Sequence, residues 1–161
     1  MKRKVARTTL LIAIAALCLS LAPAAQAAQK CSLAKAAGKW GFTLAGTLIT
    51  PTGPVPGAAV GILSVDAAGN FSGTEARNVG GAFAYETIIG SWTVNSDCTA
   101  TLTGNIYESG VLVRTSVFAV VFVDNSSKLR GVQESLTLPD GTNIPAVITA
   151  DGNMLFPDDG H

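Results

Sequence analysis

Two groups of charged residues interrupt the mostly apolar pattern of this 161-residue chain, and they are its best candidates for chemistry. Glu75 and Arg77 stand two residues apart in a segment that alternates like a strand. Arg130 and Glu134 stand four residues apart in a later segment of the same kind. A carboxylate near a guanidinium can stabilise a fold as an ion pair, orient a ligand or transfer a proton. The sequence leaves these three roles open.

The second charged group falls on an otherwise apolar face. Arg130 and Glu134 have the same parity as Val132 and Leu136, and residues of equal parity point to the same side of a strand. We therefore predict that the charged pair faces the interior beside these aliphatic side chains. Aromatic and aliphatic residues of the first predicted strand would complete a ligand cavity. Its predicted lining is Trp40, Phe42, Leu44, Arg130, Val132, Glu134 and Leu136.

Other kinds of site find little support in the sequence. There is no glycine-rich phosphate loop, Cys-His metal cluster or nucleophile elbow, and the one histidine, His161, is the last residue. We therefore predict no catalytic triad, no metal and no cofactor. Tyr85 and Tyr107 are the candidates for additional hydroxyl donors. An enzyme remains an alternative, with the carboxylate and arginine as its acid–base groups.

Residues 1–27 have the pattern of a secretory signal peptide. Basic residues open the chain, and an apolar run at 10–22 is too short for a spanning helix. Ala25-Gln26-Ala27 supplies the small residues that signal peptidase requires. We predict cleavage after Ala27, with Ala28 and an uncleaved anchor as alternatives. The mature domain, residues 28–161, would be secreted or periplasmic.

Removal of residues 1–27 leaves seven basic and eleven acidic residues, a net charge of −4. Without a basic stripe or polybasic patch, neither nucleic acid nor an anionic membrane surface is an expected partner. The same cleavage discards Cys18 and leaves Cys31 and Cys98. In an exported chain two cysteines most simply form one disulfide. A reactive cysteine is the alternative, but it lacks a neighbouring base.

The mature chain reads as one all-β domain. Residues 32–38 predict a short helical turn, and after Gly38 the hydrophobic period becomes two. Eight to ten strands follow, separated by turn signals, of which Asp140-Gly141 and Asp151-Gly152 are the strongest. Glycines inside the predicted strands favour the bends of a barrel. We predict a single antiparallel meander barrel, with a β-sandwich as the alternative.

The run at 117–123 is apolar on both faces of its predicted strand. An outer wall that is open to water normally alternates between apolar and polar residues. We therefore expect cover on the outside, and favour a homo-oligomer that forms through this strand.

Several segments carry a resemblance to known proteins. Cys31-Ser32, Gly38-Lys-Trp40-Gly-Phe42 and Asp97-Cys98-Thr99 resemble a group of small exported bacterial β-rich proteins of unknown function. That likeness covers residues 31–99 and implies paired cysteines and a β-rich fold. Gly38-x-Trp40 after a helical turn is also similar to the lipocalin and calycin signature. There the tryptophan closes the base of the cavity and often meets a late arginine, a part that Arg130 would play.

Together these observations predict an exported small barrel that binds a small apolar ligand. A structural or surface-interaction protein without a ligand is the first alternative. A cyclase or isomerase of the allene-oxide-cyclase-like barrel type is the second.

Overall fold

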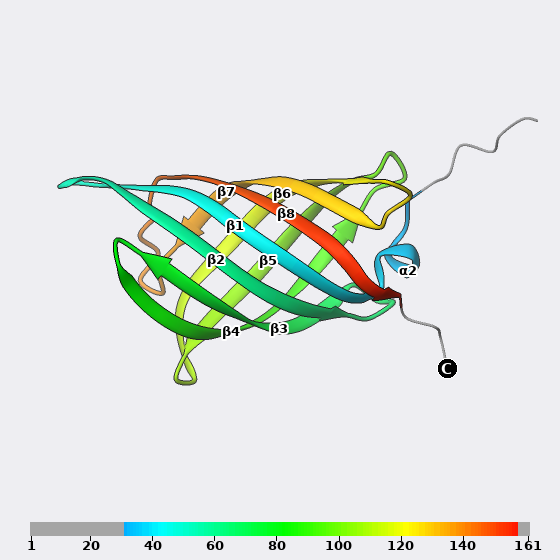
Figure 1. The fold of residues 1–161 in the computed structure, drawn as a ribbon, viewed down its shortest axis with the longest axis horizontal. Coiled ribbons are helices and arrows are strands. Elements are labelled where there is room, and N and C mark those ends of the chain that lie inside the picture. The colour runs from blue at the N-terminus through cyan, green and yellow to red at the C-terminus, as the bar shows by residue number, and fades with distance from the viewer. Residues whose placement is uncertain (1–30, 158–161) are drawn as a thin grey trace, which may run out of the picture.

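The computed structural model describes residues 31–157, which form a closed antiparallel barrel (Figure 1). Each strand pairs with the next along the chain, and the last pairs with the first. This confirms the predicted meander barrel over the sandwich. Its elements are α2 (Leu33–Ala36), β1 (Gly38–Thr50), β2 (Gly53–Val65), β3 (Asn70–Val79), β4 (Ala82–Val94), β5 (Thr99–Glu108), β6 (Val111–Val123), β7 (Lys128–Thr137) and β8 (Ala146–Pro157). The predicted signal peptide lies outside the described residues.

Short turns join the strands, as the sequence indicates. Between β2 and β3 the Asp66 carboxylate accepts hydrogen bonds from the backbone N–H groups of Ala68 and Asn70. Asp140-Gly141 also forms a turn, in which Gly141 has a φ of +87°. The hairpin predicted at Asp151-Gly152 is wrong, because β8 runs straight through both residues.

The reason for Gly152 is space rather than a turn. A Cβ at this position would lie 2.9 Å from Leu129 Cγ on the neighbouring strand β7, closer than a side chain tolerates. Gly90 on β4 likewise leaves space for the Phe71 ring, because a Cβ at this position would lie 2.4 Å from Phe71 Cζ. Some of the in-strand glycines thus make room for large interior side chains.

The helical turn predicted at 32–38 is present as α2, and it covers one end of the barrel (Figure 1). The Cys31–Cys98 disulfide ties the start of this segment to the turn between β4 and β5. Trp40 Nε1 donates a hydrogen bond of 2.9 Å to the Ala36 carbonyl oxygen. One end of the barrel is therefore plugged. A disulfide is compatible with an oxidising extracellular environment.

Beneath the plug lies an aromatic layer. The Trp92 ring is 5.4 Å from both the Trp40 ring and the Phe122 ring, measured between centroids, and 6.1 Å from that of Phe71. Such tilted and edge-on pairs add stability beyond the area they bury. They form the floor of the barrel interior.

The apolar run at 117–123 contributes to both sides of the wall. Phe118, Val120 and Phe122 are buried inside, whereas Val121 faces outward and is partly exposed. Two further exposed aromatic side chains of the outer wall are on β4, where Phe83 and Tyr85 pack edge to face. A homo-oligomer through 117–123 stays a prediction. No helix within residues 31–157 has the length and apolar character needed to cross a bilayer.

Candidate functional site

The barrel encloses a cavity of about 340 Å³ above the aromatic floor. It extends from Trp40 and Trp92 at the plugged end to Leu48, Val79 and Leu138 at the opposite rim. Its walls are mostly aliphatic and aromatic. This volume falls at the lower end of the range of roughly 300–1,000 Å³ that is typical of small-molecule sites.

Four of the seven predicted lining residues are in place. Trp40, Phe42 and Leu44 of β1 and Leu136 of β7 all line the cavity. Phe42 packs against β2 at Gly61, where a Cβ would lie 2.5 Å from Phe42 Cζ. The even-numbered side chains of the first strand therefore point into the barrel, as the alternation of this strand predicts.

The other three predicted lining residues lie on the outer wall, and this part of the prediction is wrong. The Arg130 side chain is 75% exposed and forms a long 3.8 Å ion pair with Asp151. Val132 is 56% exposed, and Glu134 is exposed as well. Arg130 does not meet Trp40, whose indole N–H binds Ala36.

A β-bulge explains this inversion. Phe118 on β6 pairs with Gln133, but the preceding Val117 pairs with Ser135, so that Glu134 is an extra residue on β7. A bulge puts two residues of one strand opposite one of its partner and shifts the alternation. Inward positions are odd-numbered before the bulge, as at Gln133, and even-numbered after it, as at Leu136. Residues of equal parity point to the same side only along a strand that no bulge interrupts.

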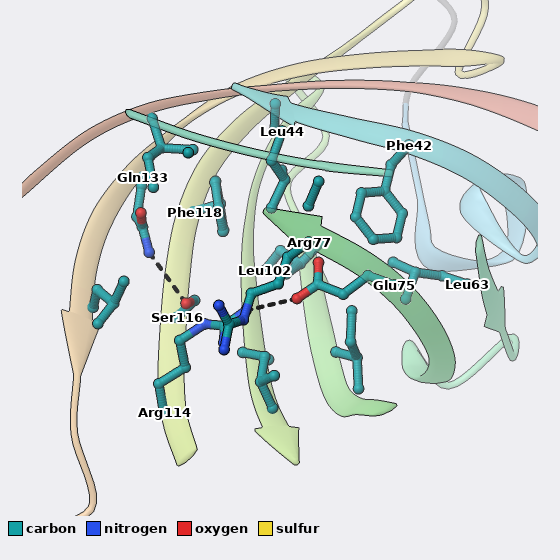
Figure 2. Close-up of a pocket in the computed structure, with 18 of the residues that line it drawn as sticks. Phe42, Leu44, Leu63, Glu75, Arg77, Leu102, Arg114, Ser116, Phe118 and Gln133 are labelled. Carbon is teal, nitrogen blue, oxygen red and sulfur yellow. Dashed lines mark hydrogen bonds and ion pairs between the residues drawn. The ribbon is translucent and has the colours of Figure 1, made fainter. Parts of the chain in front are cut away.

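The polar part of the cavity is built on β3, β4 and β6. Arg114 Nη2 donates to Glu75 Oε1 at 2.6 Å, as Figure 2 shows. Both terminal nitrogens of Arg114 also donate to Glu86, at 2.8 Å each. Arg77 Nε donates to Glu86 Oε1 at 2.7 Å and reaches Glu108 at the rim. Two guanidinium groups thus hold two buried carboxylates in one network.

Glu75 and Arg77 therefore find the partners from neighbouring strands that their inward parity requires. Glu86 and Arg114 were missed, although both share the parity of buried aromatic residues on their strands: Trp92 for Glu86 and Phe118 for Arg114. That shared parity was the signal that could have revealed them. Tyr85 is not a cavity donor, since it is 76% exposed on the outer wall. Tyr107 is also absent from the cavity lining.

A second polar contact joins the neighbouring strands β6 and β7 on the inner side of the wall. Gln133 Nε2 donates to Ser116 Oγ at 3.1 Å (Figure 2) and to the Ser135 carbonyl oxygen at 3.2 Å. Two oxygen atoms of the cavity residues remain buried without a partner, Glu75 Oε2 and Gln133 Oε1. Buried polar atoms in folded proteins are nearly always paired. These two oxygens therefore lack a donor within the described residues.

The two buried carboxyls differ in their electrostatics. Burial raises the pKa of Glu75 to about 7; Arg114 opposes this rise, and the neighbouring Glu86 adds to it. Burial also raises the pKa of Glu86, but the hydrogen bonds from Arg114 and Arg77 outweigh it, so that the net shift is downward. A carboxyl that titrates near neutrality in an apolar cavity can give or take a proton. Of the two buried carboxyls, Glu75 is therefore the candidate for proton exchange near neutral pH.

This difference predicts how stability depends on pH. The native state holds the Glu75 proton up to about pH 7, whereas the unfolded chain releases it near pH 4.5, so that this group makes unfolding easier as pH rises between these values. The free energy of unfolding of Glu75→Gln minus that of wild type should therefore be larger at pH 8 than at pH 5, by roughly 1–3 kcal/mol. Urea unfolding at both pH values measures it.

The matched control for that experiment is Glu134→Gln, which makes the same chemical change in an exposed side chain of the outer wall. A stability difference between Glu75→Gln and wild type that stays constant from pH 5 to pH 8 would contradict the elevated pKa.

A scan against models of known protein families finds none that matches the chain, and a search of curated proteins finds no match either. Among residues 31–157, no group of three or more His, Cys, Asp or Glu side chains is arranged to hold a metal ion. The cavity and its network therefore carry the functional argument.

Proposed function

We propose that this barrel binds a small, mostly apolar molecule in its interior. The observation that carries the proposal is the apolar cavity that contains Glu75, a side chain only 3% exposed with one oxygen unpartnered. Sites for small molecules combine apolar walls with a few polar groups that orient the ligand. The plug at one end leaves the opposite rim as the entrance.

A protein with a purely structural role would be expected to fill its interior, because small barrels are normally packed with side chains. The isomerase alternative would use the Glu75 carboxyl as its acid–base group, and it also requires a molecule to enter the cavity first. Binding is therefore the property to test before any reaction.

The chain has its own reporters for this test. Its two tryptophans, Trp40 and Trp92, both border the cavity. We expect the uncharged probe decyl methyl ether to change their fluorescence and to raise the melting temperature, because a ligand that binds only the native state stabilises it. Ala59→Phe, which places a ring in the cavity, should weaken binding tenfold or more.

Ala45→Phe is the matched control, since it adds the same ring at an exposed position of β1, and it should bind as wild type does. Absence of any shift with decyl methyl ether and with 1-decanol, in wild-type protein shown to be folded, would overturn the proposal and favour the structural alternative.

A further inference from the structure

The polar groups of the cavity define the head group that a ligand must carry. Its two unpartnered oxygens, Glu75 Oε2 and Gln133 Oε1, stand on opposite sides of β6 (Figure 2). Both atoms can accept a hydrogen bond, and an ionised carboxylate can only accept. A ligand that satisfies them must therefore bring a donor.

The charges around Glu75 limit the ligand further. Arg77 on β3 and Arg114 on β6 face three carboxylates, namely Glu75 on β3, Glu86 on β4 and Glu108 at the rim on β5. Each guanidinium already binds two carboxylates, so that neither arginine is free to pair with an anionic ligand. A ligand carboxylate would enter beside like charges without a cation to neutralise it.

Building on the proposed function, we infer that the ligand of this barrel is an apolar molecule with an uncharged hydroxyl head, an alcohol or a phenol, which donates to Glu75 Oε2. Gln133 Oε1 provides a second acceptor in the same cavity. Molecules with the same hydrocarbon but a carboxylate head are rejected. The discrimination comes from acceptors that stay unpaired when the head group lacks a donor.

The protonation of Glu75 adds a check on this assignment. With a pKa of about 7, the side chain is mainly an acceptor at pH 8 and mainly protonated at pH 6, where its proton is shared with Glu86. The preference for 1-decanol over the ether should therefore be smaller at pH 6 than at pH 8. The fixed charges of the cluster come from Arg114, Arg77 and Glu86, which act on Glu75 directly, and from Glu108, which binds Arg77 at the rim.

Three probes with nearly the same unbranched alkyl chain test the inference: 1-decanol, decyl methyl ether and decanoate, titrated into the wild-type protein at pH 8 with tryptophan fluorescence as the readout. We expect 1-decanol to bind about 10- to 100-fold more tightly than the ether, the range for a hydrogen bond to a charged group. Decanoate should bind most weakly of the three.

The outcomes separate the two proposals. Equal affinity for 1-decanol and the ether, or tighter binding of decanoate, would overturn the head-group inference while the cavity remains a binding site. Failure of all three probes would overturn the proposed function itself.

A variant links the preference to Glu75. In Glu75→Gln the amide oxygen can keep the contact to Arg114, which places an N–H donor at the position of Oε2. The preference for 1-decanol over the ether should fall to within threefold, and 2-decanone should bind at least as well as the alcohol. An unchanged preference would exclude Glu75 as the acceptor. If this variant does not fold, the wild-type probe series still decides the inference.

Discussion

Replacing Arg114 by methionine should lower the free energy of unfolding by about 3–5 kcal/mol, the cost of leaving buried carboxylates without their partner. Within residues 31–157, Arg114 is the only arginine that hydrogen-bonds to Glu75, whereas Glu86 is bound by both Arg114 and Arg77. Methionine keeps much of the side-chain volume, so that the loss reports on charge rather than on a void. Urea unfolding followed by tryptophan fluorescence measures it.

The control is Arg130→Met on the outer wall. Arg130 is exposed and its ion pair with Asp151 is long, and pairs of this kind contribute about 0–1 kcal/mol. Adding Glu75→Met to Arg114→Met should recover part of the loss, because it removes one of the stranded carboxylates. Equal effects of Arg114→Met and Arg130→Met would contradict the assignment of the buried network.

The contrast between these two arginines shows where the sequence pattern is informative and where it fails. Both occur in strands and both share the parity of apolar neighbours. For Arg114, which the sequence reasoning missed, alternation would have been sufficient, because β6 pairs with β5 without a bulge from Arg114 to Val121 and Arg114 therefore faces inward like Phe118. Alternation misplaces Arg130, because the bulge at Glu134 separates Arg130 from Leu136. A bulge depends on how two strands pair, which no single strand's pattern contains.

The overall fold was easier to predict from the sequence than the residues of the site. Turn residues, period-two alternation and the short connections were enough to predict a meander barrel with a helical turn at 32–38. Gly152 shows the remaining gap. Asp-Gly indicates a hairpin by local chemistry, yet here the glycine is explained by Leu129 across the strand pair. The prediction of the site residues was incomplete for the same reason, since Arg114 and Glu86 are brought together only by the register of the strands around the barrel.

The disulfide has the second large effect, and its removal should be separable from damage to the cavity. Cys31 and Cys98 are 67 residues apart in the sequence, and a closed loop of this length restricts the unfolded chain by about 4 kcal/mol in the chain-entropy treatment. The double substitution Cys31→Ala, Cys98→Ala should lower the free energy of unfolding by about 2–4 kcal/mol. Reduction of the wild-type protein should produce the same shift of the urea midpoint.

The native state should change much less than its stability, because Trp40 still binds the Ala36 carbonyl oxygen and the aromatic floor does not include the cysteines. Native tryptophan emission of the double variant should therefore match that of wild type, and its affinity for 1-decanol should stay within about threefold. A loss below about 1 kcal/mol would mean that the disulfide does not constrain the unfolded chain as expected. A stability loss accompanied by altered native emission would show instead that the disulfide holds α2 against the floor of the cavity.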